Sequence, residues 1–320
     1  MRIWLVAVVL SLWATAVIAG TVGFEQLTVP VPADRPLQVG VWYPTDAPEA
    51  VTALALGQQS VARNAPVRGR RHALIIVSHG TGGSFSDHAD TARALARAGF
   101  VVAAVSHTGD TFDDKSRVLR VVERPQHLRA VIDYMTGPWR AAAALDRRRI
   151  GAFGFSAGGF TVLAALGGEP DMGLIPAHCA AHPAYFDCQL NKTFAGQPFT
   201  TSAAGSYDPR IRAAVIAAPA LGFTFAPNGL AKVKVPIQLW RAEADTILPH
   251  PEYAEAVRNL LPGKPDYRVV AGADHFDFLQ ACTPALKRVA PQICRGSFDR
   301  TAFHAGFNAD VVAFFQKWLR

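Results

Sequence analysis

The chain has 320 residues, of which 50% are hydrophobic and 18% charged. This composition excludes a disordered or fibrous protein, and the length allows a large buried core. The net charge of +7 comes from arginines scattered through the chain, whereas a nucleic-acid-binding surface concentrates basic residues among aromatic ones, so we expect no nucleic-acid partner.

Residues 1–19 have the parts of a secretory signal peptide. Arg2 gives a positive start, apolar residues fill most of the following stretch, and Ala19 precedes the expected cleavage point. An uncleaved membrane anchor is the alternative, because the apolar stretch is almost long enough to cross a bilayer. The small residues before Gly20 favour cleavage, which predicts a periplasmic or secreted protein with no membrane span and a single domain over 20–320.

Four cysteines lie in the exported part, as Cys179 with Cys188 and Cys282 with Cys294, in turn-rich stretches. Four cysteines allow three pairings, of which two local loops are the simplest. Disulfides there would staple surface insertions in an oxidising compartment, in agreement with export. Neither pair has the two-residue spacing of zinc motifs, so we expect no metal site.

Strand and helix patterns alternate after the signal segment. The predicted strands are short apolar runs, at 37–44, 73–80, 100–106, 150–155, 211–218, 235–241 and 266–271. The predicted helices are at 86–99, 125–134, 139–145, 157–167, 251–261 and 303–319. This alternation predicts one doubly wound, mostly parallel α/β sheet.

Three segments have special positions in this scheme. The strand at 37–44 is closed by Pro44 and is expected at an edge of the sheet. Residues 46–72 are expected to be a surface excursion. The long irregular stretch 168–208 is expected to form a lid-like insertion, because loops of this length in a compact domain are usually functional or mobile.

The junction Gly154-Phe-Ser-Ala-Gly158 is a G-x-S-x-G pattern between a predicted strand and a predicted helix. Side chains on the two glycines would clash in so tight a turn, which holds the serine at its apex over the end of the sheet. The helix N-terminus favours developing negative charge. The pentapeptide alone arises by chance, but the flanking strand and helix make Ser156 a candidate nucleophile.

A serine nucleophile needs a base that takes its proton and an acid that orients the base. In an open parallel sheet these come from loops at the carboxyl ends of later strands. Asp245 follows the strand that ends near Trp240, and His275 follows the last strand. The order Ser156, Asp245, His275 is the one that accompanies this type of turn.

Other residues fit these roles less well. Glu243 is close to Asp245 but nearer the strand, while Asp274 and Asp277 adjoin His275 and cannot easily fold back onto its ring. Two other histidines are less suited to act as the base. His250 is expected to begin a helix, and His304 is expected to be a packed or solvated residue of the terminal helix.

An oxyanion intermediate needs backbone N–H donors aimed at the developing charge. Ala157, which follows the serine, is one candidate, and Thr81 in the glycine-rich loop Ser78-His-Gly-Thr-Gly-Gly83 is the other. The alternative is that this loop is a glycine-rich turn that only starts a helix. It is not expected to bind phosphate, because no Gly-Lys-Ser/Thr ending follows it. His107 and Asp110 follow a buried strand and are assigned no role.

Five strings occur in an order matched in one group of proteins: Val41-Trp-Tyr-Pro44, the 78–83 loop, Glu123-Arg-Pro125 with Asp133-Tyr134, 154–159 and 272–278. In these strings the chain resembles bacterial α/β-hydrolases of the dienelactone-hydrolase-like and platelet-activating-factor-acetylhydrolase-like superfamily. The resemblance covers nearly everything after the signal segment. It implies a serine esterase fold with Ser156, Asp245 and His275 as triad and Thr81 and Ala157 as oxyanion donors.

The chain departs from this group in two ways. Dienelactone hydrolases proper use a cysteine nucleophile, so Ser156 argues against that activity. Phe155 stands where relatives often carry histidine.

The sequence therefore predicts an exported carboxylic-ester hydrolase that works through an acyl-enzyme on a small-molecule or lipid ester, without a metal or organic cofactor. Amide or phospholipid acyl hydrolysis is an alternative, because the triad is shared and only the pocket discriminates. A binding module with a silent triad is another. The cap-like insertion 168–208, with Phe160, Tyr185 and Phe186 nearby, is a candidate apolar lid.

Overall fold

The computed structural model describes residues 20–32, 34–55, 57–197 and 206–320. The predicted signal peptide, 1–19, and part of the predicted insertion, 198–205, lie outside these residues. The described strands are β1 (Thr21–Val29), β2 (Leu37–Thr45), β3 (Ala50–Leu54), β4 (Gly57–Arg63), β5 (His72–Ser78), β6 (Val101–Ser106), β7 (Leu145–Phe155), β8 (Ile211–Ala217), β9 (Ile237–Ala242) and β10 (Asp266–Val270).

The α-helices of the described chain lie between and after these strands. They are α1 (Ala89–Arg97), α2 (Arg124–Thr136), α3 (Ala157–Ala165), α4 (Ile175–Ala181), α5 (Phe186–Thr193), α6 (Ala254–Leu260), α7 (Pro284–Val289) and α8 (Arg300–Trp318). None of them combines the length and the apolar content that crossing a bilayer requires.

The described strands join one sheet, in the order β10-β9-β8-β7-β5-β6-β2-β1-β4-β3. Neighbours are parallel from β10 to β6, and β2 joins antiparallel to β6 and β1. After β5 the chain adds β6 on one side and β7 to β10 on the other. The predicted doubly wound, mostly parallel sheet is confirmed.

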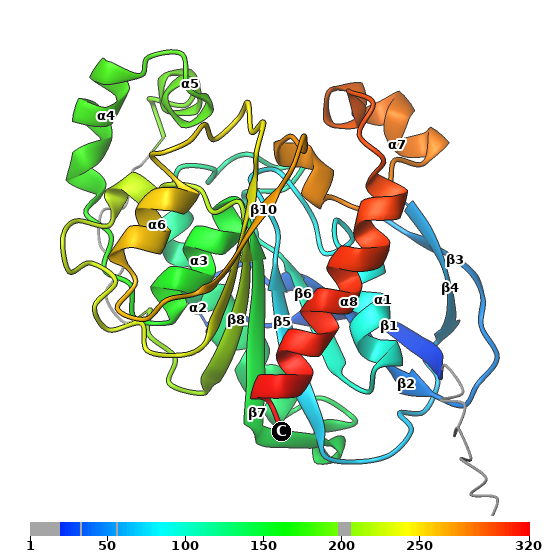
Figure 1. The fold of residues 1–320 in the computed structure, drawn as a ribbon. Coiled ribbons are helices and arrows are strands. Elements are labelled where there is room, and N and C mark those ends of the chain that lie inside the picture. Colours follow the sequence, from blue (N-terminus) through cyan, green and yellow to red (C-terminus); the bar gives the residue numbers. More distant parts are fainter. Residues whose placement is uncertain (1–19, 33, 56, 198–205) are drawn as a thin grey trace, which may run out of the picture.

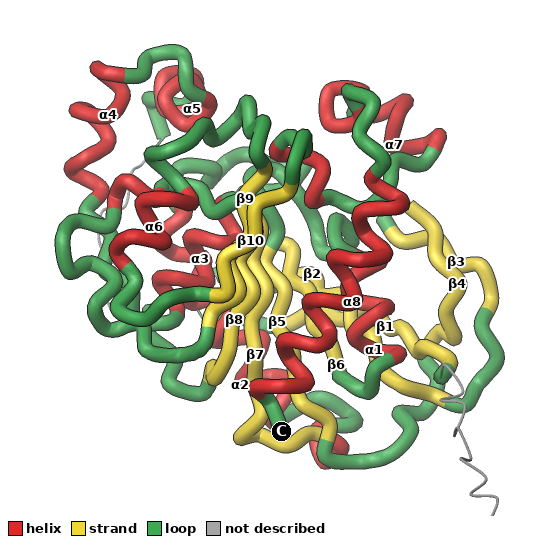
Figure 2. The backbone as a smooth tube through the Cα atoms, viewed as in Figure 1, coloured by secondary structure: helices red, strands yellow, loops and turns green. Residues whose placement is uncertain are grey.

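Helices cover both faces of the sheet, with α1 and α8 on one face and α2, α3 and α6 on the other (Figures 1 and 2). Neighbouring residues of β5 point to opposite faces. Leu74 and Ile76 belong to the core on the α2 and α3 side, whereas Ile75 and Val77 belong to the core on the α1 and α8 side. All four are buried, which is why this strand reads as an unbroken apolar run.

The predicted edge position of residues 37–44 is wrong. β2 is paired on both sides, and the sheet edges of the described chain are β3 and β10. Proline is tolerated here because β2 pairs with β6 only over Gln38–Trp42, so Pro44 lies beyond that ladder and removes no donor from it.

The predicted surface excursion over 46–72 is also wrong. Strands β3 and β4 form an antiparallel pair there, and β4 extends the sheet from β1. The Gln59 side chain connects this pair to the core, because its Oε1 accepts a hydrogen bond from Trp42 Nε1 and its Nε2 donates to the carbonyl of Ala89. Contacts with residues far along the chain therefore stabilise strands whose own pattern is weak.

Two further predictions are wrong, because the residues concerned form short elements that the sequence did not predict. Residues 139–145 form a single 3₁₀ turn at Ala142–Ala144 before β7 instead of a helix, and the Trp139 ring is buried with its Nε1 donating to Glu25. The stretch 168–208 contains α4 and α5, which the predicted irregular loop does not include. Helices of one or two turns carry too little periodicity to be found in a sequence.

The terminal helix is confirmed as a docked core helix. Phe307, Val311 and Phe315 on α8 are buried against the sheet, while Trp318 is about half exposed. The helix terminated by Gly99 is confirmed as well: α1 ends at Arg97, Ala98 caps it, and Gly99 follows the cap with a φ of +99°.

Candidate active site

Ser156 stands in a strained turn between β7 and α3, with φ +55° and ψ −120°. A positive φ is uncommon for a residue with a side chain. The flanking glycines are required by close backbone contacts: a Cβ on Gly154 would lie 2.2 Å from the carbonyl oxygen of Gly158, and one on Gly158 would lie 2.0 Å from that of Ser78. The tight strand-to-helix turn has the form that the sequence predicts.

The side chains of Ser156, His275 and Asp245 form a hydrogen-bonded chain. Ser156 Oγ lies 3.0 Å from His275 Nε2, and His275 Nδ1 lies 2.8 Å from Asp245 Oδ2. The three side chains are buried. Asp245 Oδ1 accepts the backbone N–H groups of Ile247 at 3.0 Å and Leu248 at 2.6 Å, which fixes the carboxylate.

The acidic residues near the triad bond to loop and helix residues and not to the imidazole ring of His275. Asp274 accepts hydrogen bonds from the backbone and side chain of Thr246, so it connects the loop after β10 to the loop after β9. Glu243 accepts the N–H of Gly272. Asp277 pairs with Arg300 of α8, both buried. These contacts keep the Asp245 and His275 loops together at the carboxyl end of the sheet.

Phe155 also positions the histidine. Its ring centroid lies 4.8 Å from that of His275 and 5.4 Å from that of His88. The aromatic ring at this position of the turn therefore packs directly against the imidazole.

The glycine-rich loop after β5 passes over the serine. A Cβ on Gly80 would lie 3.2 Å from the Cβ of Ser156, and Thr81 lines both cavities at Ser156. Ala157 is the first residue of α3, where N–H groups have no intrahelical partner. His107 and Asp110 lie buried behind the loop.

Comparison with known proteins shows similarity to solved structures. No protein-family model matches the chain, and no curated protein does. Among solved structures, the chain is similar to a ferulic acid esterase from Streptomyces cinnamoneus, with 22% identity, a TM-score of 0.65, and coverage of 96% of this chain and 92% of that one. The chain has the α/β-hydrolase fold. The subgroup named from the sequence strings stays a prediction.

Two cavities meet at Ser156 in this fold. The larger one, here called the cleft, has a volume of about 680 Å³ and includes both Ser156 and His275 in its lining. The smaller one, here called the slot, has a volume of about 40 Å³ and is lined by Ser156 and Ala157 but not by His275. The other side chains of the slot are mostly apolar, among them Val118, Val121, Met172, Ile175, Leu221 and Leu248.

Two cysteine-bearing segments form walls of the cleft. Phe186, Leu190 and Phe194 of the α5 region line it on one side, and Leu286 and Ile293 of the α7 region line it on the other. In Figure 1 these regions stand at the same end of the molecule. Each contains one disulfide, Cys179–Cys188 and Cys282–Cys294, the two pairs expected from the sequence.

The sequence does not predict the second wall, because residues 282–294 are identified from it only as a cysteine loop. The apolar residues of this segment are the signal that could have indicated a wall. Of the three aromatic residues expected near a lid, Phe186 lines both cavities. Phe160, on α3, is buried in the core, and Tyr185 stacks on His182.

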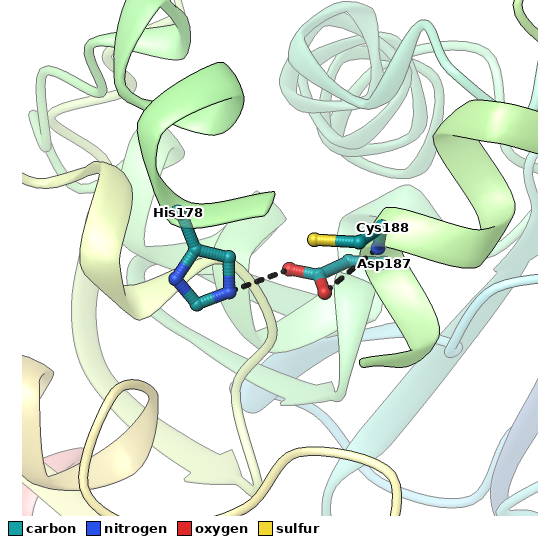
Figure 3. A group of neighbouring side chains, drawn as sticks. All are labelled: His178, Asp187 and Cys188. Atoms are coloured by element: carbon teal, nitrogen blue, oxygen red, sulfur yellow. Dashed lines mark hydrogen bonds and ion pairs between the residues drawn. The ribbon is translucent and has the colours of Figure 1, made fainter. Parts of the chain in front are cut away.

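One group of side chains in the cap has the spacing of metal ligands. Donor atoms of His178, Asp187 and Cys188 lie within 4.8 Å of one another, between α4 and the start of α5 (Figure 3). The Cys188 sulfur, however, is bonded to Cys179 and offers no thiolate. Asp187 Oδ1 accepts a hydrogen bond from the Tyr253 hydroxyl, and burial raises the Asp187 pKa. The remaining two donors do not fit a metal site.

The close approach of α3 to β5 makes a prediction about stability. Gly158→Ala is expected to lower the free energy of unfolding by about 1–3 kcal/mol, because the new methyl group collides with the Ser78 carbonyl. Gly306→Ala is the matched control: position 306 is helical and open, so alanine is expected to raise stability by up to about 1 kcal/mol. Urea unfolding measures both, and an unchanged midpoint for Gly158→Ala would contradict the close contact.

Proposed function

We propose that the protein is a carboxylic-ester hydrolase that works through an acyl-enzyme intermediate. The observation that carries the proposal is the chain of hydrogen bonds from Ser156 through His275 to Asp245, located where two cavities meet. A hydroxyl at 3.0 Å from an imidazole nitrogen is placed to lose its proton as it attacks. Similarity in fold to an esterase supports the same reaction class.

Each step of the proposed mechanism has a residue. Ser156 Oγ attacks the ester carbonyl carbon while His275 Nε2 takes the hydroxyl proton, and Asp245 stabilises the imidazolium through Nδ1. The oxyanion accepts the N–H groups of Ala157 and Thr81. The intermediate then expels the alcohol, which takes the proton from His275. A water molecule then attacks the acyl-enzyme carbonyl while His275 takes its proton, and the carboxylic acid is released as Ser156 regains its hydroxyl proton.

The two cavities divide the ester between them. The oxygen of the leaving alcohol must lie within hydrogen-bond reach of His275 Nε2 to receive its proton. His275 lines the cleft and is not among the residues that line the slot. We therefore assign the alcohol group to the cleft and the acyl chain to the slot.

The sizes of the cavities set the expected substrate class. One water needs roughly 10–15 Å³ of such space, so a slot of about 40 Å³ accommodates about three atoms of that size. An acyl group of about two to four carbons fits this volume. The cleft has room for a much larger alcohol, between aromatic side chains and the Lys115 ammonium at its rim.

The assignment of the acyl chain to the slot bears on the alternative functions. Phospholipids with long fatty acyl chains are disfavoured because such a chain exceeds the slot. Amide hydrolysis uses the same residues, and the size argument applies to it equally. A silent binding module is disfavoured by the 3.0 Å contact between Ser156 and His275. The two disulfides support export to an oxidising compartment, the periplasm or the cell exterior.

Ser156→Ala tests the nucleophile. Turnover of aryl esters is expected to fall by about 10⁴-fold or more, because the covalent step is lost while the fold is kept. A fluorophosphonate probe is expected to label the wild-type protein at Ser156 and to leave Ser156→Ala unlabelled. Ser116→Ala, at an exposed serine, is the matched control and should behave like the wild type. Retained hydrolysis by Ser156→Ala, or a folded wild-type protein without labelling, would overturn the proposal.

A panel of p-nitrophenyl esters tests the slot. The value of kcat/KM is expected to be highest for acyl chains of about two to four carbons. Met172→Ala enlarges the slot and is expected to move the optimum to longer chains. Leu279→Ala removes a similar side chain from the cleft and should leave the optimum unchanged. An optimum at eight or more carbons in the wild type, or an equal shift in both variants, would contradict the assignment of the acyl chain.

A further inference from the structure

A buried ion pair holds the glycine-rich loop from behind. Arg124, in the first turn of α2, and Asp110, after β6, are 2% and 3% exposed and in direct contact through Nη2 and Oδ2. Arg124 Nη1 donates to the carbonyl of His79 at 2.9 Å, and its Nη2 lies 3.4 Å from the carbonyl of Gly80. Asp110 Oδ1 accepts the N–H of Gly82 at 2.7 Å.

These bonds fix the peptide unit between Gly80 and Thr81. The Gly80 carbonyl also accepts hydrogen bonds from the Gly83 N–H at 3.3 Å and from His79 Nδ1 at 2.6 Å. In a trans peptide the N–H group points opposite to the carbonyl of the same unit. Because the Gly80 carbonyl points toward Arg124, the Thr81 N–H points away from it, and Thr81 lines both cavities with Ser156.

The neighbouring histidines continue this arrangement in their neutral form. Burial, followed by the Arg124 charge, holds the pKa of His79 and of His107 well below the usual range. A neutral His79 ring donates through Nδ1 to the Gly80 carbonyl and accepts the His107 N–H through Nε2 at 2.9 Å. His107 Nε2 in turn lies 2.8 Å from the Ser78 hydroxyl. Arg124 and Asp110 therefore carry the buried formal charges directly behind the loop.

We propose that Arg124 and Asp110 are positioning residues that aim the Thr81 N–H at the oxyanion. The inference rests on the proposed ester hydrolysis and concerns residues that do not touch the substrate. Arginine suits the role because its planar guanidinium reaches two carbonyls and a carboxylate at once, which the point charge of lysine does not. The proposal also gives a function to the arginine of the Glu123-Arg-Pro125 string.

The test compares Arg124→Lys with the wild-type protein, and with Arg120→Lys as a control for the same exchange on the neighbouring turn. An oxyanion donor acts in the transition state, so its misplacement lowers kcat and leaves ground-state binding alone. For Arg124→Lys we expect kcat to fall by about 10²-fold, the size of the loss of one oxyanion donor. KM should change by less than about threefold, and the pH at which kcat/KM is half-maximal should stay that of the wild type, because His275 and Asp245 are untouched.

A second variant tests the proposal if Arg124→Lys does not fold. Arg124→Gln combined with Asp110→Asn removes both charges together and leaves no buried charge unpaired. Circular dichroism and thermal melting establish that each variant is folded. A purely structural pair predicts wild-type kcat in the folded double variant, and that result would overturn the proposal. A shifted pH profile would overturn it too, since the effect would then pass through His275.

The assay separates this inference from the function on which it rests. Wild-type protein and Ser156→Ala are measured in the same experiment. Hydrolysis that depends on Ser156 but not on Arg124 removes the positioning role alone. Absence of hydrolysis by the wild-type protein removes both proposals.

Discussion

The strained backbone at Ser156 is the constraint on which the candidate site depends. A non-glycine residue at positive φ costs about 1–3 kcal/mol and persists only where its surroundings enforce it. Here the Ser156 N–H donates to the Ala217 carbonyl, and the Ser156 carbonyl accepts the N–H groups of Gly159, Phe160 and Ala220. The turn is therefore held by β8 and by the first turn of α3, so the position of the hydroxyl is set by the centre of the sheet.

The partners of Ser156 stand on loops, and buried charged contacts hold those loops to regular elements. Arg300 of α8 pairs with Asp277 in the loop of His275. Arg124 of α2 pairs with Asp110 behind the glycine-rich loop. Removing one partner of such a pair leaves a charge unpaired in the protein interior, which is strongly unfavourable. Loops that lack their own secondary structure thereby acquire fixed positions relative to the helices.

The walls of the cleft are stabilised differently. α4 and α5 have 7 and 8 residues, and α7 has 6, lengths at which an isolated helix is unstable in water. Each wall contains a disulfide, with a sequence separation of 9 in one and 12 in the other. A covalent bond restricts the unfolded chain and so compensates for a small apolar contact area. The core thus determines the proposed chemistry, and the stapled walls determine the shape around it.

The sequence by itself determined the sheet centre and the candidate triad, because these follow from local patterns. Unbroken apolar runs identify strands buried on both faces, and the order Ser156, Asp245, His275 follows from where later strands end. Only the tertiary structure decided the interior place of β2, the β3–β4 pair, the second wall at 282–294 and the Arg124–Asp110 pair. Each of these depends on contacts between residues far apart in the chain. No local period or spacing records which distant group a strand, a loop or a buried charge will meet.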